Sequence, residues 1–193
     1  MTLNDWLSMD YGQNQPLDAS GSNTSVIGIG GSCHWCTEAI FSSLKGVTHV
    51  QQGWIATAED LENFSEAILV SFNPEIISLN KLIEVHLRTH SSTVMHSMRE
   101  KYRSAVYTFD DTQGKLARFI IKELQQDFAE PIITKVDGFG TFKLNKPEYL
   151  NYYFADPDKP FCQNIVNPKL KLLLREFSGE VDHNKLKHLE GKE

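Results

Sequence analysis

The chain has 193 residues, enough for one domain with a sizeable core, and this length argues against a second full domain. Its formal net charge of -6 argues against a general affinity for nucleic acid. No stretch resembles a membrane span, and the N-terminus lacks the basic start and apolar core of a secretory signal. We therefore expect a cytoplasmic monomer with neither nucleic acid nor a membrane as partner.

Hydrophobic periodicity and turn residues predict the elements in chain order. Residues 1–24 are polar and form a predicted N-terminal arm, either mobile or wrapped around the domain. Predicted strands lie at 26–29, 46–55, 66–72, 104–109 and 132–136, and predicted helices at 33–45, 78–88, 110–128, 147–154 and 168–177. The second and third strands are expected to pair antiparallel.

The order β-α-β-β-α-β in the first half predicts an α+β fold, a two-layer sandwich with a ferredoxin-like split β-α-β core. We assign this domain to residues 25–177. The charged segment 178–193 is predicted to be a frayed C-terminal tail.

One motif, Gly-Gly-Ser-Cys-His-Trp-Cys-Thr-Glu at residues 30–38, lies between the first strand and the first helix. The glycines permit a tight turn, and Ser32 is a candidate helix cap. Cys33 would then sit in the first turn, where free backbone N–H groups and the helix dipole favour thiolate over thiol. We interpret Cys33 as a candidate nucleophile. The alternative is that Cys33 and Cys36 are small buried hydrophobic residues.

Three further residues are candidates for the same site. Glu66 starts a strand, Tyr102 precedes another, and Cys162 follows a turn-rich segment that we expect to be mobile. An acid beside a thiolate can protonate an oxygen that leaves sulfur, and a phenol can hydrogen-bond that oxygen. Alternatively, Glu66 is a charge at a strand edge and Tyr102 an ordinary half-buried aromatic residue.

Two other types of site use a Cys-x-x-C motif. A structural zinc ion requires four ligands, and the second half-site lacks a paired motif. The candidate ligands are Cys33, Cys36 and Cys162 with one of His34, His90 or His96. A thioredoxin-like disulfide exchanger is the other alternative, but the chain lacks a convincing βαβ unit before the motif. We expect no metal and no cofactor.

The chain resembles the A-type peptide methionine sulfoxide reductases. The residues that carry the resemblance extend from about residue 25 to residue 177. They are Gly30 to Ala39, Lys45-Gly46-Val47, Ser65-Glu66-Ala67, Phe72-Asn73-Pro74, Ile77-Ser78, Tyr102 to Tyr107, Gly140-Thr141-Phe142, and Pro160-Phe161-Cys162 through Pro168-Lys169-Leu170.

The resemblance implies reduction of the S form of methionine sulfoxide. Cys33 would attack the sulfoxide sulfur, Glu66 would protonate its oxygen, and Tyr102 would hydrogen-bond that oxygen. Trp35 and the neighbouring His34 would contact the substrate, with Trp35 receiving its methyl group. A sulfenic acid on Cys33 would be resolved by Cys162 or by the nearer Cys36, and thioredoxin would reduce the disulfide.

The chain also departs from the family pattern. His34 replaces a phenylalanine, no tyrosine lies between Gly53 and Glu66, and Ser97 stands in place of an aspartate. Losing one hydrogen bond to developing charge can cost ~10²-fold in rate. The alternative function is therefore a catalytically impaired family member that acts as a thiol redox sensor or binding module.

Overall fold

A computed structural model describes residues 24–190. The strands are β1 (Ser25–Gly30), β2 (Val47–Thr57), β3 (Ser65–Phe72), β4 (Ala105–Thr108) and β5 (Lys135–Leu144). The helices are α2 (His34–Ser42), α3 (Leu79–Thr89), α4 (Asp111–Leu124), α5 (Tyr152–Ala155), α6 (Asn167–Glu176) and α7 (His183–Leu186). Short 3₁₀ turns cover Gln125–Asp127, Pro147–Tyr149 and Lys187–Leu189, and a π-helical turn covers Cys162–Val166.

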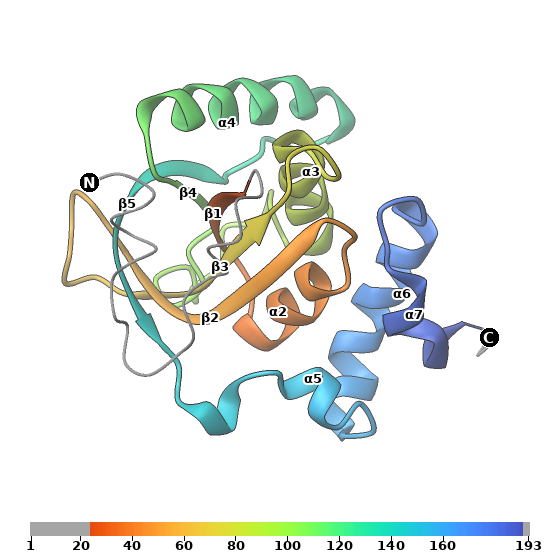
Figure 1. The fold of residues 1–193 in the computed structure, drawn as a ribbon. Coiled ribbons are helices and arrows are strands. Elements are labelled where there is room, and N and C mark those ends of the chain that lie inside the picture. The colour runs from red at the N-terminus through yellow and green to blue at the C-terminus, as the bar shows by residue number, and fades with distance from the viewer. Residues whose placement is uncertain (1–23, 191–193) are drawn as a thin grey trace.

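The protein has a single mixed sheet that closes into a barrel in the order β1-β3-β2-β5-β4 (Figure 1). Strand β3 lies between β1 and β2 and is antiparallel to both, as expected for the second and third predicted strands. The predicted two-layer sandwich is not confirmed, because β5 pairs with β2 and also, in parallel, with β4. The sheet therefore has no free edge there.

Strand β5 differs from its prediction in position. It begins at Lys135 and continues to Leu144, whereas the sequence pattern placed a strand at 132–136. Two glycines interrupt the apolar pattern of this stretch. At Gly140 a Cβ atom would lie 2.3 Å from the carbonyl oxygen of Thr57, so only glycine permits this approach of β5 to β2.

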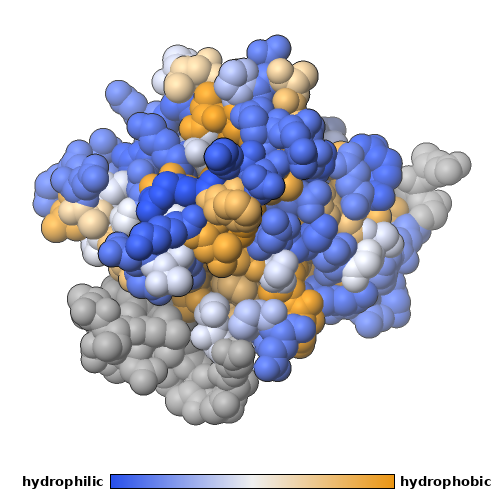
Figure 2. Space-filling view, turned by 90° about the horizontal axis from the view of Figure 1, so that it is seen from above, coloured by the Kyte–Doolittle hydropathy of each residue, from blue (hydrophilic) through white to orange (hydrophobic). Residues whose placement is uncertain are grey.

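Local signals explain the two longest helices. Ser78 caps α3 by accepting a hydrogen bond from the Lys81 backbone N–H, and Asp110 caps α4 in the same way with Gln113. Helix α4 covers one end of the molecule in Figure 1, and Figure 2 views that end, where hydrophilic side chains surround an apolar area. Leu116 is one exposed apolar residue of α4.

The core has two parts, because successive side chains of a strand point to opposite faces of the sheet. Val26 of β1 belongs to the smaller cluster, with Tyr107 and Phe142, whereas Ile27 and Ile29 belong to the larger cluster that includes the helices. Every residue of β3 is buried. This strand, which carries Glu66, therefore packs against one core cluster on each of its two faces.

The segment after residue 177 is not a frayed tail in the part that the structure describes. Val181, Leu186 and Leu189 are buried in the larger core cluster. Val181 also forms an isolated antiparallel bridge with Leu44, just beyond α2. Three apolar residues in a charged stretch are enough to anchor it, so that prediction was wrong for residues 178–190.

The predicted N-terminal arm falls on residues 1–24, and all but Thr24 lie outside the described residues. Within residues 24–190, no helix has both the length and the apolar character that crossing a membrane requires.

Candidate active site

Cys33 lies at the junction of β1 and α2, as predicted, but it occupies the N-cap position itself. The helix begins at His34, and no side chain caps it, so Ser32 does not have the predicted capping role. Gly31 has a φ of 147°, and a Cβ there would lie 2.7 Å from the ring of His90. A glycine at this position lets the chain turn into the helix beside the partly buried His90.

The environment of Cys33 favours its thiolate. A hydrogen bond from the Cys36 thiol is the main cause that lowers the pKa of Cys33, and the backbone N–H of Trp35 adds to it. Burial and the charge of Glu66 act in the opposite direction. The net pKa of the Cys33 thiol is below its ordinary value, as expected for a thiol at a helix N-terminus.

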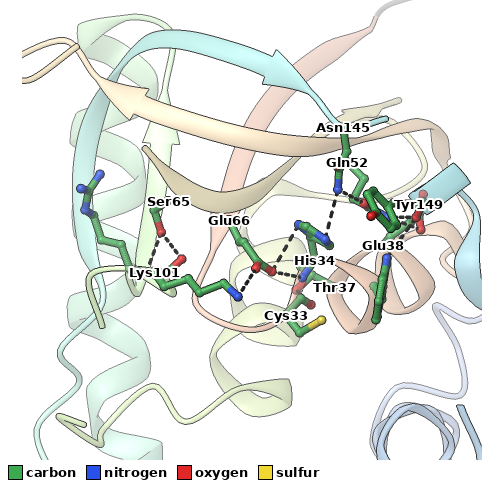
Figure 3. A network of polar contacts seen from close by, with 12 residues as sticks. Cys33, His34, Thr37, Glu38, Gln52, Ser65, Glu66, Lys101, Asn145 and Tyr149 are labelled. Atoms are coloured by element: carbon green, nitrogen blue, oxygen red, sulfur yellow. Dashed lines mark hydrogen bonds and ion pairs between the residues drawn. The ribbon is translucent and has the colours of Figure 1, made fainter. Parts of the chain in front are cut away.

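Glu66 comes from β3 and lies at the first turn of α2. Its Oε2 accepts a hydrogen bond from the backbone N–H of His34 at 3.1 Å, and its Oε1 lies 3.1 Å from Nζ of Lys101. The Glu66 side chain is only 5% exposed. The buried carboxyl group of Glu66 is therefore bound to the backbone N–H of the residue that follows Cys33, at the start of α2 (Figure 3).

His34 lies between this carboxyl group and a second polar group. Its Nδ1 is 3.2 Å from Oε2 of Glu66, although not aligned for a good hydrogen bond, and Asn145 Nδ2 lies 3.2 Å from its Nε2. Burial lowers the pKa of the imidazole, which favours the neutral form. Because the amide of Asn145, as placed, donates to Nε2, the ring proton is assigned to Nδ1, on the Glu66 side.

Aromatic rings flank this imidazole. Trp35 and Trp54 each form a T-shaped pair with His34, at centroid distances of 6.0 and 5.9 Å. Trp35 stacks on Tyr152 at 4.0 Å, and its indole N–H donates to the carbonyl of Tyr149. The predicted substrate-contacting pair, Trp35 and His34, is thus fixed against α5 and β2.

Tyr102 reaches the cluster through its neighbour in sequence. The ammonium of Lys101 lies 5.1 Å from the centroid of the Tyr102 ring, and Tyr102 contributes to the raised pKa of Lys101. Lys101 was not among the site residues predicted from the sequence. A lysine before a strand has no distinctive local pattern, and only the fold reveals its contact with Glu66.

A polar network that was not predicted lies on the side of His34 away from Glu66. Asn145 donates to Gln52, and Gln52 donates to Glu38 of α2 at 2.8 Å. Glu38 also accepts the backbone N–H of Asn151 at 2.8 Å. Burial raises the pKa of Glu38. Gln52 and Trp54 are two residues apart on β2 and therefore lie on the same face of the strand. This spacing was the one feature of the sequence that could have indicated a place for Gln52 near the site.

All three cysteines are free, and two of them are inaccessible. Cys36 is 1% exposed, and its hydrogen bond to Cys33 raises its pKa. Cys162, for which we expected a mobile segment, is fully buried in the π-helical turn, and burial raises its pKa. Cys162 is near enough to Cys36 to influence its titration.

Among residues 24–190, no group of three or more His, Cys, Asp or Glu side chains is arranged to hold a metal ion. His90, one of the candidate zinc ligands, instead lies 2.8 Å from the Ser104 hydroxyl and stacks on His86. The structure gives the zinc alternative no support.

A cysteine with a lowered pKa, placed beside a carboxyl group at a helix N-terminus, is an arrangement that suits thiol chemistry. Residues 25–181 match the family model described as peptide methionine sulfoxide reductase. The chain belongs to that family. It is similar to a peptide methionine sulfoxide reductase MsrA of Chromobacterium violaceum, with 32% identity over 78% of this chain and 94% of the relative.

Solved structures share the fold. The reduced form of Mxr1 from Saccharomyces cerevisiae matches with a TM-score of 0.66 and 21% identity, over 75% of this chain and 92% of that one. Mxr1 in complex with Trx2 matches with a TM-score of 0.56 and 22% identity, over 72% of this chain and 91% of that one.

Proposed function

We propose that this protein reduces methionine S-sulfoxide, free or within peptides. The observation that carries the proposal is the pairing of Cys33 and Glu66 at the first turn of α2. The thiol has a lowered pKa, and the carboxyl group is bound to the backbone N–H of the next residue. A nucleophile and a proton donor are therefore held on one helix end.

In the proposed reaction, the Cys33 thiolate attacks the sulfoxide sulfur, and Glu66, which takes up a proton from solvent before the attack, delivers it to the oxygen. Tyr102 hydrogen-bonds that oxygen, and Trp35 with His34 receives the methyl group. The S–S bond to Cys33 forms as the S–O bond breaks, and the protonated oxygen takes up a second proton from solvent and leaves as water. Attack of water on the cysteine sulfur then breaks the S–S bond and releases a proton, so methionine leaves as the sulfide and Cys33 becomes a sulfenic acid. The two electrons gained by the substrate come from the cysteine sulfur. No cofactor or metal is required.

The second half of the cycle uses a second thiol. Attack on the sulfenic acid by Cys36 or Cys162 forms a disulfide and releases water. Thioredoxin then reduces the disulfide, a role supported by the solved complex of the related Mxr1 with Trx2. The proposal keeps the sequence-based expectations of a cytoplasmic monomer without nucleic-acid or membrane partners.

We expect the protein to reduce the S epimer of a methionine sulfoxide peptide with dithiothreitol or thioredoxin and to leave the R epimer unchanged. Chromatographic separation of the two epimers during turnover measures this directly. The alternative thiol sensor predicts oxidation of Cys33 by peroxide with no turnover of either epimer. That result would overturn the reductase proposal.

We expect Cys36 to be the first resolving thiol. Both candidate thiols are buried, but Cys36 is one helical turn from Cys33 and already hydrogen-bonds it. Peptide mapping by mass spectrometry after one equivalent of sulfoxide should find a Cys33–Cys36 disulfide. In Cys162→Ser this disulfide should persist. A Cys33–Cys162 disulfide as the first product would contradict the expectation.

A further inference from the structure

We propose that Lys101 binds the sulfoxide oxygen, donating a hydrogen bond from its ammonium group beside Glu66. This inference rests on the proposed reductase function and adds a residue to the site. The relevant observation is an ammonium group at 3.1 Å from the buried carboxyl group that is proposed to protonate that oxygen.

The position of Lys101 suits this role. Its side chain is 46% exposed, whereas that of Glu66 is 5% exposed, so the ammonium lies on the solvent side of the carboxyl group. The other carboxylate oxygen is occupied by the backbone N–H of His34. A substrate that approaches Glu66 from solvent therefore meets Nζ of Lys101, which enters from the side opposite His34 in Figure 3.

The backbone fixes Lys101 in place. Its carbonyl oxygen accepts hydrogen bonds from the Glu66 N–H and from the Ser65 hydroxyl, each at 2.9 Å. These bonds hold the residue next to the start of β3 independently of its side chain. Replacing the side chain therefore leaves the backbone connection between this loop and β3 intact.

The ammonium group has a donor to spare. A lysine ammonium carries three N–H groups, and the ion pair with Glu66 accounts for one of them. Tyr102 and Glu66 raise the pKa of Lys101, so the charge is retained across the neutral range. The N–H groups that Glu66 does not use are available to an acceptor arriving from solvent.

The chemistry requires such a donor. As the S–O bond breaks, negative charge develops on oxygen, and a prepositioned cation stabilises that charge more than it stabilises the neutral sulfoxide. Sequence comparison with the family pattern leaves this chain with Glu66 and Tyr102 as oxygen ligands and no second tyrosine. Lys101 supplies a third donor. It remains an ammonium throughout and forms no covalent bond.

The test compares Lys101→Met, which removes the charge and the donors, with Lys101→Arg, which keeps both. Lys122→Met, on the exposed face of α4, is the matched control. We expect Lys101→Met to lower kcat by ~10²-fold, Lys101→Arg to retain a substantial part of it, and Lys122→Met to match the wild type. Alkylation of Cys33 by iodoacetamide, followed against pH, is measured on the same proteins and should be nearly unchanged.

Two results would overturn the inference while leaving the reductase function standing. The first is a Lys101→Met protein with wild-type kcat. The second is a parallel loss of turnover and Cys33 alkylation, which would mean that Lys101 acts only by setting the state of the thiol. If the wild-type protein reduces no sulfoxide, the proposed function itself fails and the inference fails with it.

Discussion

Replacing the nucleophile, Cys33→Ser, is expected to lower sulfoxide reduction by at least ~10³-fold, because a serine hydroxyl cannot form the sulfenic intermediate. Steady-state turnover with dithiothreitol measures the loss. The change is nearly isosteric at a partly exposed position, so the thermal unfolding midpoint should move little.

Thiol labelling provides the control for this variant. Because the pKa of Cys33 is lowered and that of Cys162 is raised, iodoacetamide at neutral pH should label the wild type and Cys162→Ser but not Cys33→Ser. The labelling rate of Cys33 should reach half its maximum at a lower pH than that of an ordinary thiol. Undiminished turnover in Cys33→Ser would exclude Cys33 as the nucleophile.

The second large effect is expected from Glu66→Gln, which should lower kcat by ~10² to 10³-fold. The glutamine carbonyl can still accept the His34 N–H, but the amide cannot transfer a proton to the sulfoxide oxygen. The exposed Glu62→Gln, in the loop before β3, is the matched control and should retain wild-type kcat.

Glu66→Gln is expected to increase the reactivity of the Cys33 thiol although it lowers kcat. The charge of Glu66 raises the pKa of Cys33, so removing that charge should lower the pKa further and increase alkylation at mildly acidic pH. Reduced turnover with a more reactive thiol would separate proton transfer from nucleophile activation. Wild-type kcat in Glu66→Gln would rule out a role for Glu66 as the acid.

Sequence reasoning succeeded where the structural signal was local. The helix at 78–88 was predicted from its amphipathic pattern, and the structure confirms it as α3 (Leu79–Thr89), which Ser78 caps. The predicted place of Cys33, between a strand and a helix, was also confirmed, because it too rested on a local pattern. The Ser32 cap was wrong because Cys33 itself takes the N-cap position, which the residue types alone do not reveal.

The predictions failed where distant segments meet. Nothing near residue 135 indicates that β5 pairs with both β2 and β4, so closure of the sheet could not be anticipated. The contacts of Glu66 with Lys101 and of His34 with Asn145 likewise join residues far apart in sequence. Cys36 is the exception, since its spacing of three from Cys33 already placed both thiols within one helical turn.

The bridge between Leu44 and Val181 affects the order of events during synthesis. The ribosome produces the nucleophile helix early, but the residues that pack beside its C-terminal end are translated long afterwards. Until then, the side chains of the larger core cluster that pack against Val181, Leu186 and Leu189 in the folded protein stay exposed. The nascent chain therefore carries its reactive cysteine at least until Val181 has been added, before the mature packing around that helix is complete.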